Sequence, residues 1–110
     1  MSLQAAWLYL FIAGLLEVGW AIAMKYSAGL TRPAPTVATF AMGFASFFFL
    51  ARATEQLPIG TAYAVWTGIG AVGTALLGMV LFAEPRHAVR LASIALIVLG
   101  IVGLRLFSTP

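Results

Sequence analysis

The stretch AGLLEVGWAIAMK, residues 13–25, places one carboxylate, Glu17, inside an apolar run. Apolar residues extend from Leu3 to Met24, a length that suits a membrane-spanning helix of about 20 residues. At 1.5 Å per residue, Glu17 would lie about 20 Å from one end of this helix and about 12 Å from the other. An ionised carboxylate at that depth is costly unless it meets water, a cation or hydrogen-bond donors. Glu17 is therefore the first candidate for a functional group.

The composition of the whole chain is typical of an integral membrane protein. Of its 110 residues, 63% are hydrophobic and 8% are charged, whereas soluble domains carry about 25% charged residues. Four runs are long and apolar enough to span a membrane: Leu3–Met24, Pro35–Ala53, Ile59–Phe82 and Val89–Phe107. We expect an all-α, multi-pass protein of the cell membrane, with residues 1–110 forming a single four-helix transmembrane domain.

The segments between these runs are short, which predicts that helices consecutive in the chain are antiparallel and that both termini lie on one side. The breaks contain prolines and most of the charges, as in KYSAGLTRPAP (residues 25–35) and AEPRHAVR (residues 83–90). Four basic residues would fall on one side of the membrane: Lys25, Arg32, Arg86 and Arg90. The other two, Arg52 and Arg105, would fall on the opposite side. This bias is weak, so insertion in both orientations (dual topology) is expected.

Several classes of function are disfavoured by the residue types present. The chain has no cysteine and a single histidine, His87, which we interpret as a loop residue, so no metal site or cofactor is expected. The six basic residues are scattered and form no stripe that would bind nucleic acid. No pairing of nucleophile and base is apparent, so we do not expect an enzyme.

The residues around Glu17 favour a site for an organic cation. Gly14 lies one helical turn before Glu17, where a small residue leaves space, and Trp20 lies one turn after it with an indole N–H and an aromatic face. Further candidates come from the other runs: Ser46 midway along the second, and Tyr63 and Trp66 on one face of the third. A carboxylate beside aromatic rings combines charge pairing with cation–π attraction. The alternative is that Glu17 is a structural hydrogen-bonding group between helices.

The run GIGAVG, residues 68–73, matches the G-x-G-x-x-G pattern of dinucleotide-binding loops. That function needs a preceding strand within a βαβ unit, and here the pattern lies inside an apolar helix. Small residues at such spacing let helices approach closely, and clustered glycines permit bending. We predict a packing surface and hinge at Gly68, Gly70 and Gly73.

Three strings carry a family resemblance: GLLEVGWAIAMKYSAGLTR, LPIGTAYAVWTGIGAVG and FAEP. They resemble the small multidrug resistance (SMR) transporters across essentially the whole chain. Within that family, the tryptophan that follows E-V-x and the string GTAYAVWTGIGAVG resemble the guanidinium-exporter subtype, Gdx, also called SugE.

The resemblance implies an antiparallel homodimer of four-helix subunits with both copies of Glu17 in one shared site. By matching position, Glu17 would bind substrate or proton, and Trp20 and Ser46 would hydrogen-bond its carboxylate. Tyr63 and Trp66 would line the pocket, and Gly14 would give room beside the glutamate. The implied function is proton-coupled export of guanidinium by alternating access.

Two other functions remain open from the sequence. One is a broader exporter of quaternary ammonium and other small cations within the same family. The other is a membrane subunit that transports nothing, in which Glu17 only pairs with a partner helix.

Overall fold

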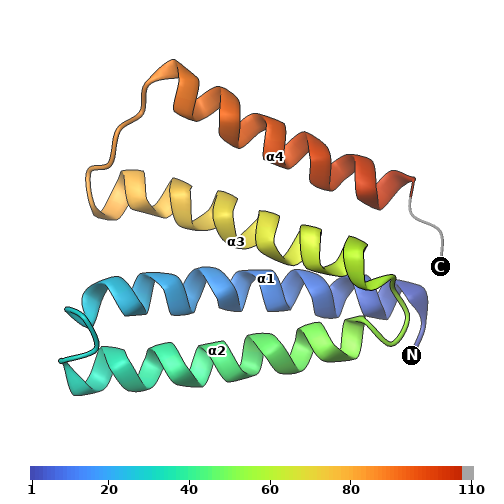
Figure 1. Ribbon diagram of the computed structural model, residues 1–110, viewed down its shortest axis with the longest axis horizontal. Helices are drawn as coiled ribbons and strands as arrows, with labels where there is room; N and C mark the ends of the chain where they lie inside the picture. The colour runs from blue at the N-terminus through green and yellow to red at the C-terminus, as the bar shows by residue number, and fades with distance from the viewer. Residues whose placement is uncertain (108–110) are drawn as a thin grey trace.

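The computed structural model describes residues 1–107, which form four α-helices (Figure 1). They are α1 (Leu3–Tyr26), α2 (Pro33–Ala53), α3 (Ile59–Leu81) and α4 (Ala88–Leu106). Each helix is long and apolar enough to cross a membrane. The prediction of an all-α protein with four helices capable of spanning a membrane is therefore confirmed.

The helix ends differ slightly from the predicted runs because local hydrogen bonds decide them. α1 continues to Tyr26, where the backbone N–H of Ser27 binds the carbonyls of Ala23 and Met24. α2 begins at Pro33, since proline lacks the N–H that has no partner in the first turn of a helix. α4 begins at Ala88, because Nδ1 of His87 accepts a hydrogen bond of 3.3 Å from the backbone N–H of Arg90. His87 is thus a helix cap.

The four helices lie side by side in a row, in the order α2, α1, α3 and α4 (Figure 1). The row measures 41 × 35 × 16 Å. The row is flat, since its shortest dimension is less than half of either of the other two, but α3 also reaches α2 in one half through a hydrogen bond from Trp66 to Ser46. Helices consecutive in the chain run in opposite directions, and the N-terminus and the last turn of α4 lie at the same end.

One half of the row is packed more tightly than the other. The buried apolar cluster comes from the first half of α1, the end of α2 with the connection that follows it, and the start of α3: Ala6, Trp7, Leu10, Ala13, Leu50, Ala53, Leu57, Ala62, Val65 and Trp66. The second half of α1 borders open grooves instead. Glu17 follows the last α1 residue of this cluster by four positions, so it lies where close packing gives way to the grooves.

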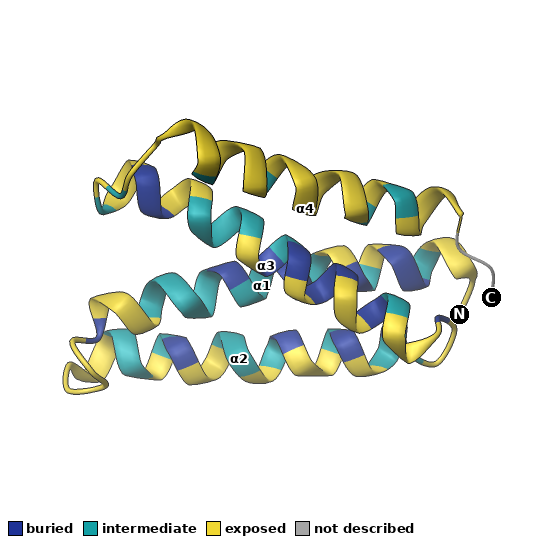
Figure 2. Ribbon diagram, turned by 45° about the horizontal axis from the view of Figure 1, so that its top comes forward, coloured by how far each residue is buried: buried dark blue, intermediate teal, exposed yellow. Residues whose placement is uncertain are grey.

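α4 is the least enclosed helix. It has no buried residue, and Figure 2 shows exposed positions along almost its whole length. Its contact with α3 depends on Gly68, where an added Cβ would lie 2.9 Å from Cδ1 of Ile101. Between Arg90 and Arg105 the helix is apolar except for Ser93, so this segment is suited to contact with lipid or with another chain.

Candidate cation-binding site

The carboxylate of Glu17 points from α1 towards the backbone of α3 at Gly70. A Cβ at residue 70 would lie 2.5 Å from both Cδ and Oε2 of Glu17, so the carboxylate can occupy this position only beside a glycine. Oε2 is buried and has no hydrogen-bond partner among residues 1–107. A buried carboxylate oxygen without a donor is costly, and a bound cation or proton would remove that cost.

Glu17 opens into a groove of about 390 Å³ between α1 and α3. Its lining consists of small or polar residues and one aromatic residue: Glu17, Trp20, Ala21, Thr67, Gly70, Ala71, Thr74, Ala75, Glu84 and Arg90. Of the residues singled out in the sequence, the groove brings together Glu17, Trp20 and Gly70. It therefore combines a carboxylate, an indole and two threonine hydroxyls in one space.

Thr67 and Thr74 are groove residues that were not identified from the sequence. They lie seven residues apart, three before and four after Gly70, so all three share one face of α3. This spacing is visible in the sequence. It becomes informative only once Gly70 is known to face Glu17, because apolar membrane helices often carry threonine without any ligand.

Ser46 binds two groups other than Glu17. Its hydroxyl donates to the backbone carbonyl of Ala13 at 2.7 Å and accepts from Nε1 of Trp66 at 2.9 Å. These bonds tie α1, α2 and α3 together in the packed half. Since the one hydroxyl proton of Ser46 is used on Ala13, a bond from Ser46 to the Glu17 carboxylate would need a different side-chain arrangement. Its role in orienting Glu17 stays a prediction.

Tyr63 and Trp66 form an aromatic group in the packed half of the row. Their ring centroids are 5.6 Å apart, and Phe47 of α2 lies 5.5 Å from Trp66. Trp66 is buried, whereas 56% of the Tyr63 surface is exposed. Neither residue lines the groove that contains Glu17. Their predicted role as pocket residues therefore remains untested by the single chain.

Three glycines allow close contact of α3 with α1 and α4. A Cβ at Gly14 would lie 2.6 Å from Cγ2 of Ile69, and one at Gly73 would lie 2.5 Å from Cγ2 of Val18. Gly68 makes the corresponding contact with α4. Gly14 thus fits against a side chain of α3 and leaves no open space there. These contacts agree with close packing at the GIGAVG run, and its function as a hinge stays a prediction.

A second, apolar groove adjoins the first at Trp20. It has a volume of about 350 Å³ and is lined mainly by side chains of α2: Trp20, Met24, Leu30, Thr39, Phe40, Gly43, Phe44 and Phe47. Trp20 is half-buried and lines both grooves. In the part of the chain that the structure describes, no group of His, Cys, Asp and Glu side chains is suited to hold a metal ion.

Comparison with known proteins gives a consistent result over most of the chain. Residues 5–97 match the family described as Small Multidrug Resistance protein. The guanidinium exporter of Yersinia pseudotuberculosis is 57% identical over 103 residues, which cover 94% of this chain and 99% of the relative. The guanidinium exporter of Escherichia coli (strain K12) is 56% identical over 101 residues, 92% and 96% of the two chains. That of Proteus vulgaris is 50% identical over 103 residues, 94% and 99% of the two chains.

Proposed function

This chain belongs to the Small Multidrug Resistance protein family and is a multi-pass membrane protein, and from this we propose that it exports guanidinium in exchange for protons. Relatives at 57% and 56% identity are named guanidinium exporters, which describes transporters and not enzymes. The proposal assigns the central step to Glu17, which binds a proton and the cation in turn. The observation that carries it is the buried Oε2 atom of Glu17, which has no partner among residues 1–107.

The groove residues suit the chemistry of guanidinium. The cation is planar, and two of its N–H groups match the two oxygens of a carboxylate in a bidentate contact. Trp20 beside Glu17 supplies an aromatic surface for cation–π attraction. The hydroxyl oxygens of Thr67 and Thr74 can accept hydrogen bonds from the remaining N–H groups.

Exchange follows from competition for one carboxylate. A proton on Glu17 removes the negative charge that pairs with guanidinium, so the site holds either protons or the cation. If only a loaded site changes its facing, proton movement into the cell drives the cation out. We further propose that a second copy in the opposite orientation completes the site, because two such copies would make the inward- and outward-facing states equivalent.

Replacement of Glu17 by glutamine tests this function. Wild-type protein in proteoliposomes should move guanidinium against its gradient when a proton gradient is applied, and Glu17→Gln should reduce this flux to background. The matched control is Glu55→Gln, which makes the same change at an exposed glutamate in the α2–α3 connection and should transport like wild type. Guanidinium transport driven by the proton gradient that persists in Glu17→Gln would contradict the mechanism.

The pH dependence of binding gives the second readout. Once the carboxyl is mostly protonated, the Kd for guanidinium should rise about tenfold for each unit by which the pH falls, because one proton competes with one cation. Glu17→Gln should show no such dependence. Binding to wild type that does not change with pH would exclude competition at a common group.

A second candidate function is export of larger quaternary ammonium cations. The apolar groove of about 350 Å³ beside Trp20 favours it, since its aromatic lining suits a bulky cation. Competition separates the two functions. If this protein binds aromatic quaternary ammonium compounds tightly and does not transport guanidinium, export of quaternary ammonium cations is favoured.

A further inference from the structure

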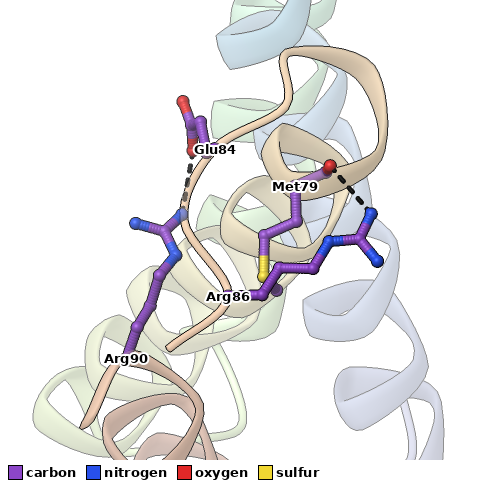
Figure 3. Close-up of polar contacts among 4 residues, drawn as sticks. All are labelled: Met79, Glu84, Arg86 and Arg90. Atoms are coloured by element: carbon purple, nitrogen blue, oxygen red, sulfur yellow. Dashed lines mark hydrogen bonds and ion pairs between the residues drawn. The ribbon is translucent and has the colours of Figure 1, made fainter. Parts of the chain in front are cut away.

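A second carboxylate, Glu84, lies at the far end of the groove that contains Glu17. It belongs to the connection between α3 and α4, and its Oε1 accepts a hydrogen bond of 2.8 Å from Nη2 of Arg90 in the first turn of α4 (Figure 3). The side chain of Glu84 is 41% exposed and that of Arg90 is 28% exposed. The pair is thus within reach of solvent and also part of the groove lining.

Glu84 lies between Glu17 and the end of the helices. It lines the groove around Glu17 and also a neighbouring cavity of about 500 Å³, which reaches Lys25 and Phe82 at the ends of α1 and α3. The two spaces share Ala21, Thr74 and Glu84. Gly70 faces Glu17 and Gly78 faces Glu84, and eight residues of helix correspond to about 12 Å.

The inward position of the Glu84 carboxylate is built by the α3–α4 connection. An added Cβ at Gly78 would collide with this carboxylate, so the glycine provides the space that it occupies. The backbone N–H of Glu84 donates to the Gly78 carbonyl at 3.3 Å, and Ala83 turns the chain with φ of 52°. Nη2 of Arg86 holds the end of α3 by donating to the Met79 carbonyl at 3.0 Å (Figure 3). None of these contacts involves the guanidinium group of Arg90.

The group that pairs with Glu84 is chemically the same as the proposed substrate. Arg90 carries a guanidinium, and the structure shows it in a single contact, from one nitrogen to one carboxylate oxygen. Nε of Arg90 is buried without a hydrogen-bond partner among the described residues. A free guanidinium ion can instead approach in the bidentate geometry, which is the stronger one. Replacing Arg90 by the ion would leave Glu84 neutralised.

We propose that Glu84 is an outer subsite for guanidinium-class cations, and that an incoming cation displaces Arg90 from Glu84 on its way to Glu17. The proposal rests on guanidinium being the transported cation. Arg90 then acts as a tethered competitor that occupies the subsite when no substrate is present. The exchange keeps the Glu84 carboxylate paired throughout, while the displaced guanidinium of Arg90, whose side chain is 28% exposed, turns to solvent.

The test compares the signs of two effects on the KM for guanidinium in proteoliposomes. Glu84→Gln removes the subsite and should raise KM roughly threefold to tenfold at low salt, with a smaller effect at high ionic strength. Arg90→Ala removes the competitor and should lower KM roughly twofold to threefold. The controls are Glu55→Gln and Arg52→Ala, which break the ion pair of 3.0 Å that lies outside the groove. If Glu84→Gln and Arg90→Ala shift KM equally in the same direction, the pair is only structural and the proposal is overturned.

A binding measurement separates the subsite from transport. In the Glu17→Gln protein, titration with ¹⁵N-guanidinium should show weak binding that strengthens when Arg90→Ala is added and disappears when Glu84→Gln is added. If Arg90→Ala does not fold, Arg90→Lys serves in its place, because an ammonium lacks the planar fork. If the affinity for guanidinium is unchanged by Glu84→Gln, the proposed subsite is overturned. Absence of guanidinium flux in wild type would instead refute the proposed transport, and the titration would still decide the role of Glu84.

Discussion

Gly70 determines where the Glu17 carboxylate can lie. α1 places the side chain far from both helix ends, and the missing side chain at position 70 lets the carboxylate rest against α3. In this position Oε2 has no hydrogen-bond partner within residues 1–107. A glycine that would otherwise belong only to helix packing is therefore part of the candidate site.

Replacement of Gly70 by alanine should move the carboxylate and weaken guanidinium binding. The added Cβ would lie 2.5 Å from Oε2, so the Glu17 side chain must rotate away. We expect the Kd to rise roughly tenfold or more, since the carboxylate leaves its bidentate position. Gly60→Ala is the control, because Gly60 lies on the same helix and an added Cβ there would have no atom within 4 Å. Equal affinities of the two variants would show that Gly70 does not position Glu17.

Ser46 offers a second prediction at this scale. Ser46→Ala removes the link between Ala13 and the indole of Trp66, so the free energy of unfolding should fall by about 1–2 kcal/mol. Thermal unfolding in detergent, followed by circular dichroism, measures this loss. If Ser46 instead acts mainly on Glu17, stability will be unchanged and the pH dependence of guanidinium binding will shift.

At the scale of the helices, α3 uses opposite sides for its two neighbours. Gly70 and Gly73 face α1, and Gly68 faces α4. Small residues permit this close approach, which matters in a membrane because helices gain little from the hydrophobic effect there. The groove that contains Glu17 is lined by the same stretch of α3, from Thr67 to Ala75. Packing along α3 and access to the site are thus parts of one arrangement.

The contact between Gly73 and Val18 can be tested by a pair of substitutions. Gly73→Ala places a Cβ 2.5 Å from Cγ2 of Val18 and should destabilise the protein by about 1–3 kcal/mol. Val18→Ala in the same chain should restore part of that loss by making room. Unfolding free energies of the two single variants and the double variant form the cycle. Simple additivity of the two losses would mean that the residues do not touch.

At the scale of the whole molecule, the row of helices has two open faces. Its buried apolar cluster is confined to one half of the row, and large apolar side chains remain exposed on every helix. Lipid can cover such surfaces, but its hydrocarbon offers no hydrogen-bond partner to the polar side chains on the face where the groove with Glu17 opens. A second copy of the chain, as proposed above, would cover that face and bring a second glutamate.

Cross-linking tests the proposed antiparallel homodimer. The native chain has no cysteine, so any disulfide between two chains must involve the single cysteine that is introduced. Leu96 lies near the middle of α4 and Val89 near its start, and the two are 68% and 73% exposed. If α4 pairs with itself in opposite directions, Leu96→Cys should form a disulfide-linked dimer in membranes and Val89→Cys should not. Efficient cross-linking of both would indicate parallel chains.

Much of the fold could be predicted because the bilayer is a demanding solvent. Backbone groups in hydrocarbon must be paired, so apolar runs of this length have few alternatives to helices. Glu17 could be identified as the candidate functional residue for the same reason, since an acidic side chain is costly inside an apolar membrane helix. The helix ends were less predictable, because they depend on local contacts such as the hydrogen bond from the backbone N–H of Arg90 to His87 at the start of α4.

The sequence by itself determined four helices able to span a membrane and one carboxylate inside an apolar run, because both follow from local composition and the cost of burying charge. Only the tertiary structure decided what each polar side chain meets. Ser46 binds Ala13 and Trp66, Gly70 faces Glu17, and Thr67 and Thr74 join the groove. These pairings depend on the order, crossing and register of the helices in the row. Interhelical distances of a few ångströms set them, and no local pattern in the chain encodes such distances.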